Sequence, residues 1–250
     1  MSAQSFAPEE LYATVIAGLL DGLDHVAVGM ASPIPATGAL LTQARNHGAT
    51  RVSILGNPKG AQWTNGGAEL FDMAGRGRIG AFFLSGGQID GSANINLVGT
   101  GSYPQSDTRW SGSFGSAYLY FVVPRVILFR WEHSRRTLVE QVDFISAPGQ
   151  SEPGVYRPGG PVALITNLCA FDYDRGRGRF KLKSIHPGHS LEEVRDNTGF
   201  DFDVSDAVPQ TSAPDAETLA ILRGPVAARM RTLYPVFADT VFGAANAQSA

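Results

Sequence analysis

The sequence predicts an α/β fold built on an open, largely parallel sheet with helices on both faces. Short β-branched apolar runs alternate with helical segments of about ten residues, as in parallel strands linked by crossover helices. Small and polar residues gather directly after several of these runs, where parallel sheets commonly bind ligands. The 250 residues, 43% of them hydrophobic and 17% charged, are enough to bury one sizeable core.

The elements of this core follow one another in order. A proline and two acids at Pro8–Glu10 start a predicted helix that runs to about Leu20. The patterns then predict strands at 25–29 (HVAVG), 51–55 (RVSIL) and 81–84 (AFFL), with helices at 35–46 and 67–74. The predicted core ends with three further elements, a strand-like stretch at 94–98, a helix at 115–123 and a strand at 125–131.

After Pro148 the alternation of predicted strands and helices ends, and the sequence becomes rich in proline and glycine. A proline- and glycine-rich loop leads to a predicted antiparallel pair, 163–173 with 180–185, and Ser190 caps a predicted helix that reaches Thr198. The C-terminal segment is expected to be helical, with a frayed tail after Phe242. These segments predict a single domain over residues 1–250, made of an α/β core at 1–147, an antiparallel extension at 148–204 and a helical segment at 205–250.

Composition limits the partners and cofactors that this chain can use. Its 20 basic and 23 acidic residues give a formal net charge of −3, which argues against a nucleic-acid partner. No apolar run reaches the roughly 18 residues of a membrane span, and no secretory signal pattern is present, so we expect a cytoplasmic protein with no membrane partner. The single cysteine, Cys169, excludes an intrachain disulfide and is expected to be buried and inert. His186 and His189 have no third ligand nearby in the sequence, so we predict no metal site and no cofactor.

Loops rich in glycine, serine and asparagine form the candidate binding surface, because they follow predicted strands or open a predicted helix. Their candidate pocket residues are Ser32, Asn57, Gly86, Gly87, Gln88, Asp90, Asn94, Ser113, Phe114 and Gly115. Backbone amides and polar side chains at these positions could donate to a carbonyl oxygen or a developing anion. Alternatively, the glycines only supply positive φ angles in tight turns. No phosphate-loop or nucleophile-elbow motif is present.

Isolated ionisable residues allow two interpretations each. Asp90 and Glu69 are either general acids or bases, or turn caps and ion-pair partners. His133, followed by Arg135 and Arg136, either contacts a phosphate or belongs to a solvated strand exit. No aspartate or glutamate occurs between Asp24 and Glu69, so the loops in that span lack a carboxylate of their own.

Segments over about residues 8–204 carry a family resemblance. These are 29–41 (GMASPIPATGALL), 85–98 (SGGQIDGSANINLV), 111–116, 142–149 (VDFISAPG) and 186–204 (HPGHSLEEVRDNTGFDFDV). They resemble the β subunit of class I CoA-transferases of the glutaconate type. The most specific piece is the pattern Q-x-D-x-x-x-N-x-N at Gln88, Asp90, Asn94 and Asn96. The resemblance implies an open α/β fold, an acyl-CoA substrate, a homologous α subunit as partner and an active site between the two chains.

The chain departs from this family at one decisive position. The resemblance implies a glutamate at a strand end that attacks the thioester, but here that strand end reads ILGNP at 54–58 and offers no such nucleophile. No catalytic residue is therefore certain in this chain.

The segments SPIPAT, FFLSGGQIDG, RWSGSFGSA and VPRVILFRWEHSRRTLV (32–37, 82–91, 109–117 and 123–139) resemble more closely the β subunits of cholesterol ring-cleaving hydrolases, a branch with the same loss. That resemblance implies hydrolytic carbon–carbon cleavage of a 6-oxocyclohex-1-ene-1-carboxyl-CoA left from steroid rings C and D. It also implies an α2β2 heterotetramer whose α subunit supplies the essential glutamate. A CoA-transferase that recruits another carboxylate, such as Glu69 or Asp90, and a non-catalytic ligand-binding or regulatory module are the alternatives.

Overall fold

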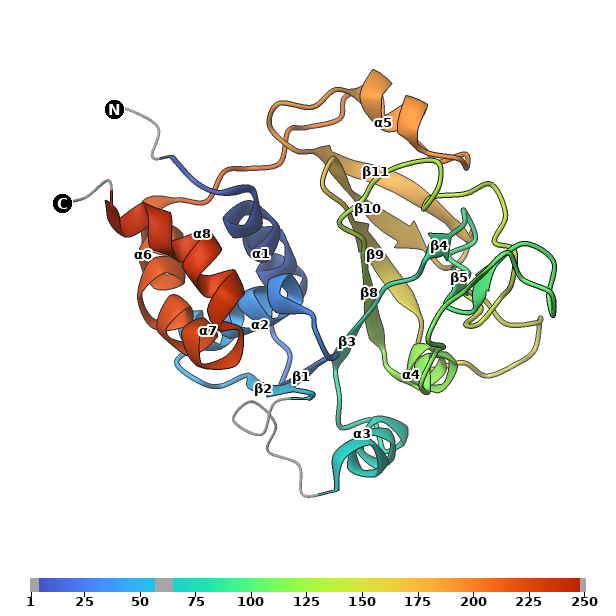
Figure 1. Ribbon diagram of the computed structural model, residues 1–250, viewed down its shortest axis with the longest axis horizontal. Helices are drawn as coiled ribbons and strands as arrows, with labels where there is room; N and C mark the ends of the chain where they lie inside the picture. Colours follow the sequence, from blue (N-terminus) through green and yellow to red (C-terminus); the bar gives the residue numbers. More distant parts are fainter. Residues whose placement is uncertain (1–4, 57–64, 248–250) are drawn as a thin grey trace. The chain divides into compact units, whose positions relative to one another are not determined.

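A computed structural model describes residues 5–56 and 65–247 of this chain (Figure 1). One seven-stranded sheet has the order β11-β10-β9-β8-β3-β1-β2. Its strands are β1 (His25–Val28), β2 (Arg51–Ile54), β3 (Ala81–Leu84), β8 (Arg125–Phe129), β9 (Pro161–Ile165), β10 (Cys169–Asp174) and β11 (Arg179–Ile185). β1 pairs in parallel with β2 and β3, and β8 pairs in parallel with β9, whereas β10 is antiparallel to both β9 and β11. The predicted fold class is therefore confirmed.

The burial of the strands follows from this topology. Every residue of β1 and of β3 is buried, as expected for parallel strands covered on both faces. β11 instead alternates buried and accessible positions along its length, the pattern of an antiparallel strand with one face on the core and one face toward solvent.

The helices lie close to their predicted positions. They are α1 (Pro8–Leu19), α2 (Pro33–Arg45), α3 (Gly66–Gly75), α4 (Ser116–Val122), α5 (Leu191–Asn197), α6 (Ala216–Ile221), the π-helix η1 (Leu222–Val226), α7 (Ala227–Leu233) and α8 (Pro235–Ala247). The Ser190 side chain caps α5 by accepting from the Glu193 amide, as its sequence pattern indicates. Within the described residues α8 continues to Ala247, and the expected fraying of the tail stays a prediction.

Two predicted strands differ in the structure. The stretch 163–173 is not one strand, since a turn at Thr166–Leu168 separates β9 from β10. The Thr166 hydroxyl accepts from the amides of Leu168 and Cys169 and closes this turn without glycine or proline.

The stretch 94–98 does not join the main sheet. Only β5 (Ile95–Asn96) forms there, antiparallel to β4 (Gln88–Ile89). A second small pair, β6 (Gly99–Thr100) with β7 (Thr108–Arg109), follows it.

The chain forms two compact units. Unit 1 contains residues 1–70, 79–81 and 212–250, and unit 2 contains residues 71–78 and 82–211. These boundaries differ from the expected ones at 147 and 204, and the single-domain assignment stays a prediction.

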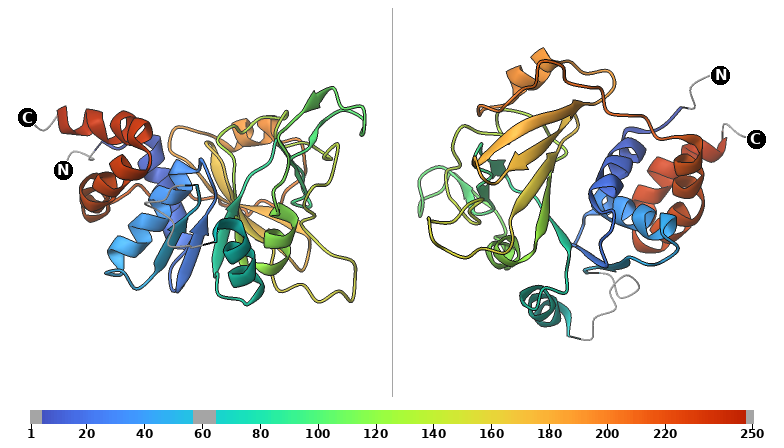
Figure 2. Two further views of the ribbon diagram at one scale, coloured as in Figure 1. Left: turned by 60° about the horizontal axis from the view of Figure 1, so that its bottom comes forward. Right: turned by 180° about the vertical axis from the view of Figure 1, so that it is seen from behind.

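Within unit 1 the C-terminal helices, red in Figure 2, pack with α1 and α2, drawn in blue. Arg223 of η1 secures this arrangement through two hydrogen bonds of 2.7 and 2.8 Å to the buried carboxylate of Glu10 in α1. Among the described residues, no helix is both long and apolar enough to span a bilayer.

Candidate functional site

The Q-x-D-x-x-x-N-x-N pattern builds the β4–β5 hairpin of unit 2. Asn96 Nδ2 donates to Gln88 Oε1 and to the Gly99 carbonyl, each at 2.7 Å, and Asn96 Oδ1 accepts from the Val98 amide at 2.9 Å. Gln88 Oε1 also accepts from the Asp143 amide at 3.0 Å. Gln88 and Asn96 are both buried, so their polar atoms mainly satisfy one another and the neighbouring backbone.

Asp90 closes the turn of the same hairpin. Its Oδ1 accepts from the amides of Ser92 and Asn94, and its Oδ2 accepts from Asn94 Nδ2, all at 3.0 Å. Asn94 Oδ1 in turn accepts from the Gly149 amide at 3.1 Å. Asp90 is buried, and it is therefore a turn cap, the second of its two predicted roles.

Neighbouring side chains lie so close to Gly86 and Gly87 that only glycine fits at these positions. Neither residue has a positive φ angle, so backbone conformation is not the reason. A Cβ at Gly86 would lie 2.6 Å from Ile95 Cγ2, and a Cβ at Gly87 would lie 2.1 to 2.5 Å from ring atoms of Trp110. The Gly87 amide donates to the Asn96 carbonyl at 2.9 Å. The Gly87 amide and Gln88 Oε1 are thus occupied within the hairpin, and the role of Gly86, Gly87 and Gln88 as donors to a ligand stays a prediction.

A cavity of about 560 Å³ opens beside these glycines in unit 2. Its lining combines hydroxyl groups, two guanidinium groups and the Trp110 indole, from Ser85, Gly86, Gly87, Leu97, Thr100, Thr108, Trp110, Ser111, Gly112, Arg130, Arg136 and Thr137. Such a lining offers many hydrogen-bond donors and positive charge to an oxygen-rich group. We call it the glycine-loop cavity.

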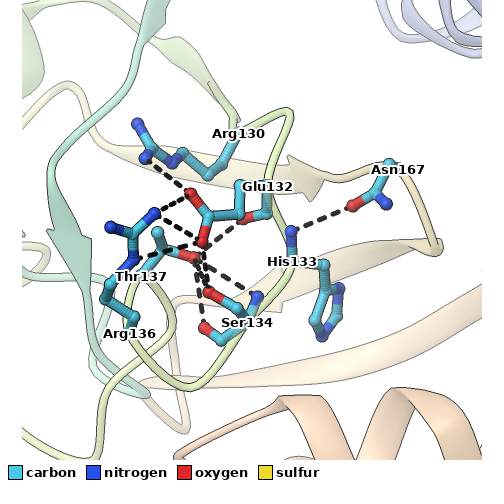
Figure 3. Close-up of polar contacts among 7 residues, drawn as sticks. All are labelled: Arg130, Glu132, His133, Ser134, Arg136, Thr137 and Asn167. Atoms are coloured by element: carbon cyan, nitrogen blue, oxygen red, sulfur yellow. Dashed lines mark hydrogen bonds and ion pairs between the residues drawn. The ribbon is translucent and has the colours of Figure 1, made fainter.

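The two arginines of this cavity share one carboxylate, that of Glu132 (Figure 3). Arg136 Nη2 donates to both carboxylate oxygens at 2.8 and 3.0 Å, and Arg130 Nη2 lies 3.6 Å from Oε2. Ser134 Oγ donates to Glu132 Oε1 at 2.7 Å. This hydrogen bond, followed by the two arginines, lowers the pKa of Glu132. With only one carboxylate for two guanidinium groups, the cluster keeps a net positive charge at the cavity.

His133 takes neither of its predicted roles. It points away from Glu132 in Figure 3, is buried, and places Nδ1 and Nε2 each 2.8 Å from the hydroxyls of Thr166 and Thr198. Burial lowers its pKa to about 4. Both hydroxyls also donate to backbone carbonyls, Thr198 to Val194 and Thr166 to Cys169. His133 is neither a phosphate contact nor a solvated residue, since both ring nitrogens are used inside the core.

The other histidines and the cysteine have structural partners. His186 is buried between the Thr211 hydroxyl and the Thr166 carbonyl, at 2.8 and 3.1 Å, and burial lowers its pKa to about 4. His189 contacts Glu193 at 2.9 Å. Cys169 is buried, and burial raises the pKa of its thiol, so it is inert as predicted. Over residues 5–56 and 65–247, no group of three or more potential metal ligands forms.

The remaining predicted site residues belong to separate places. Ser32 lies in unit 1, where its hydroxyl donates to the Met30 carbonyl at 3.0 Å. Asn57 lies outside the described residues. Ser113, Phe114 and Gly115 precede α4 in unit 2, and Gly115 has φ +79° with its α-carbon against the Phe71 ring. Glu69 accepts from the Asn65 amide at 3.2 Å, a capping contact at the start of α3.

Sequence reasoning missed Arg130, Glu132 and Trp110 as site residues. The spacing R-x-E-x-x-x-R over 130–136 was the available signal, because it places two guanidinium groups on either side of one carboxylate after β8. Trp110 is far from Gly87 along the chain, and no local pattern pairs them.

The sequence of this chain matches a known protein family over most of its length. The profile of the family described as "Coenzyme A transferase" matches residues 14–197. The chain belongs to this family.

Three curated proteins are similar to this chain over part of its length. The chain is 35% identical over 153 residues to the B subunit of 3-oxoadipate CoA-transferase from Pseudomonas knackmussii, covering 59% of this chain and 58% of that protein. It is 32% identical over 148 residues to the B subunit of glutaconate CoA-transferase from Acidaminococcus fermentans, covering 56% and 54%. It is 27% identical over 159 residues to the cholesterol ring-cleaving hydrolase IpdB subunit of Rhodococcus jostii, covering 62% of each. The matched region thus spans little more than half the length of these relatives.

Solved structures share the fold of this chain. The decarboxylase AibA/AibB superposes with a TM-score of 0.74 at 26% identity, covering 96% of this chain and 100% of that chain. IpdAB of Rhodococcus jostii RHA1 superposes with a TM-score of 0.77 at 24% identity, covering 88% and 94%, which supports the fold alone.

Proposed function

We propose that this chain is the β-type subunit of a heteromeric enzyme that cleaves a carbon–carbon bond of an acyl-CoA without forming an acyl-enzyme. The preferred substrate is the cyclic keto acyl-CoA 6-oxocyclohex-1-ene-1-carboxyl-CoA from steroid rings C and D, opened by a retro-Claisen-like hydrolysis. The observation that carries the proposal is the absence of any carboxylate between Asp24 and Glu69, a span that includes the strand end where the family resemblance places a nucleophilic glutamate.

The other carboxylates that a transferase could recruit are already engaged. Asp90 is buried and accepts three hydrogen bonds of 3.0 Å within its turn. Glu69 accepts a backbone amide at the start of α3, and Glu132 is paired with Arg136 and bonded to Ser134. A carboxylate whose oxygens are engaged in hydrogen bonds or ion pairs is a poor nucleophile, so none of the three favours covalent catalysis.

The reaction itself needs donors more than it needs a nucleophile from this chain. Water adds to the ring ketone of a β-keto thioester, the bond to the α-carbon breaks, and the thioester carbonyl receives the electron pair as an enolate. Protonation of the enolate at the α-carbon then gives an open-chain acyl-CoA that carries a new carboxylate. A base must take the proton from water, and we assign that base to an α-type partner homologous to IpdA, in an α2β2 assembly. Arg130, Arg136 and the hydroxyls of the glycine-loop cavity would hold the carboxylate that forms or the developing oxyanion.

The names of the relatives support two further outcomes. The higher identities, 35% and 32%, are to CoA-transferase subunits, which keeps CoA transfer as the alternative. Decarboxylation, named for AibA/AibB, is a carbon–carbon cleavage that needs the same enolate stabilisation. A ligand-binding module without chemistry is the third alternative.

Reconstitution of this chain with an α-type partner separates these outcomes. We expect ring opening of the cyclic keto acyl-CoA with its thioester intact, and no turnover by this chain alone. Borohydride reduction in the presence of acyl-CoA and a free acid should label no carboxylate of this chain. A reduced glutamyl residue here would establish the transferase, and an unchanged substrate at every partner concentration would establish the binding module.

Arg136→Gln tests the assignment of the cavity. We expect kcat/KM to fall by roughly 10²-fold, the usual effect of removing one donor to a developing anion. Arg135→Gln is the matched control, because Arg135 bonds the Asp196 carbonyl and is absent from the cavity lining. Equal activity of the two variants would remove this cavity from the active site.

A further inference from the structure

A second cavity of unit 2, of about 370 Å³, lies at the far end of β8 and β9 from Arg130. It is formed where the chain enters β9 at Gly159 and leaves β10 at Tyr173. Arg130 follows the last residue of β8, which runs parallel to β9, so the two cavities are at opposite edges of this part of the sheet. This second cavity is therefore separate from the glycine-loop cavity.

The lining of the second cavity contains three arginines, Arg157, Arg175 and Arg177, and no carboxylate. Arg177 has its counter-ion outside the lining, since its guanidinium pairs with Asp203. The acid of the adjacent turn, Asp174, accepts from the amides of Gly176 and Arg177 with its Oδ1. Arg157 and Arg175 are thus two like charges at one cavity without an acid among its walls.

Arg157 is held in place by uncharged groups. Its guanidinium carbon lies 5.1 Å from the ring centroid of Tyr120 and 5.7 Å from that of Phe121, and it donates to the carbonyls of Gly159 and Tyr120 at 3.1 and 3.0 Å. Its Nη1 is buried and has no hydrogen-bond partner. Burial lowers the pKa of Arg157, and the charge of Arg175 lowers it further. The guanidinium is therefore oriented but not neutralised.

Two glycines let the other polar groups of this cavity lie directly on the backbone. A Cβ at Gly160, which has φ +146°, would lie 2.6 Å from Arg175 Nη2. A Cβ at Gly178, with φ +67°, would lie 1.8 Å from Gln150 Nε2. The Gln150 amide and both guanidinium groups thus add donors around the same hollow.

We propose that this cavity binds the phosphate group of a small molecule, with Arg157 and Arg175 as its charged donors. A tetrahedral oxyanion offers several acceptor oxygens to donors that come from different directions, and its charge offsets the repulsion between the two guanidinium groups. The site lies apart from the cavity to which we assign chemistry, so occupancy is expected to change stability and not the catalytic step.

Titration calorimetry and thermal unfolding of the full chain test this site with inorganic phosphate, with AMP, and with sodium chloride at matched ionic strength. We expect saturable phosphate binding and an increase in Tm beyond that in chloride. Preference for inorganic phosphate or for AMP identifies the free ion or a nucleotide as the source of the group. A Tm increase equal to that in chloride, or no saturable heat with either probe, would overturn the proposal.

Arg175→Gln is the decisive variant, because Arg175 is exposed and its removal leaves the Arg157 contacts in place. Its Kd for the preferred probe should rise about tenfold or more, as expected for loss of a charge-assisted hydrogen bond. Arg195→Gln, at an exposed position of α5, is the matched control and should bind as the parent chain does. Equal weakening in both variants would also overturn the site. Reconstituted acyl-CoA cleavage should be unchanged in Arg175→Gln, so this test is independent of the proposed enzyme activity.

Discussion

Asn96 donates to Gln88 across the β4–β5 hairpin at 2.7 Å, with both side chains buried. These are the first and last residues of the pattern that most strongly indicated the family from sequence. The pattern therefore marks a hairpin whose polar groups satisfy one another, placed directly after the strand that delivers Ser85, Gly86 and Gly87 to the cavity. Its role is to hold the glycine loop in position.

Gln88→Ala should reduce the free energy of unfolding by about 2 kcal/mol, because it removes the acceptor of the Asp143 amide and one of the two acceptors of Asn96 Nδ2. Urea denaturation measures the change. Gln105→Ala, at an exposed loop position, is the control and should have little effect. A stable Gln88→Ala protein with greatly reduced turnover would return Gln88 to the substrate pocket.

Asp90→Asn should reduce stability by about 1 to 2 kcal/mol while activity per folded molecule is retained. In the parent chain Asn94 Nδ2 donates to Asp90 Oδ2. The amide of the variant can place its own NH2 donor there, opposite the Asn94 donor. Asp72→Asn, at an exposed position on α3, provides the comparison. Loss of turnover in a fully folded Asp90→Asn enzyme would instead assign a chemical role to this carboxylate.

Gly87→Ala should destabilise the chain by about 1 to 3 kcal/mol and change the tryptophan fluorescence, because the added methyl group enters the Trp110 ring position. Combining it with Trp110→Leu should recover part of the loss. Gly18→Ala is the control, since Gly18 lies within α1 with open space at its Cβ position and alanine there should be neutral or stabilising. If Gly87→Ala is as stable as the parent chain, the close approach is not a constraint.

Stability should fall as the pH decreases from about 6.5 to about 4. Burial holds the pKa of both His133 and His186 at about 4 in the folded chain, whereas an unfolded histidine titrates near 6.5. In this window the unfolded state binds protons that the folded state does not, so the folded state loses up to about 3 kcal/mol for each histidine, and the loss ends below about pH 4.

Denaturation at a series of pH values, with the parent chain and His133→Gln, measures this dependence. The variant should show a shallower acid limb even if its stability at pH 7 is lower. An identical slope in the two proteins would show that His133 is not neutral in the fold. His47→Gln, at an exposed position, serves as the control.

Local patterns were sufficient for the α/β architecture, most strand and helix positions, the cap at Ser190 and the burial of Cys169. Periodicity, caps and turn residues act between near neighbours along the chain, so they can be read without tertiary information. The missing carboxylate at the strand end is likewise a property of the sequence alone, and it is the basis of the proposed chemistry.

Contacts between distant segments supplied the rest. Several contacts join positions that no local pattern relates. They are the contact of Trp110 with Gly87, the hydrogen bond of Asn94 with the Gly149 amide, and the hydrogen bonds of His133 with Thr166 and Thr198. The same holds for the turn at Thr166–Leu168, which a single hydroxyl closes. Whether a polar residue faces a ligand or the core depends on which donors and acceptors the folded chain brings within 3 Å of it, and that becomes visible only in three dimensions.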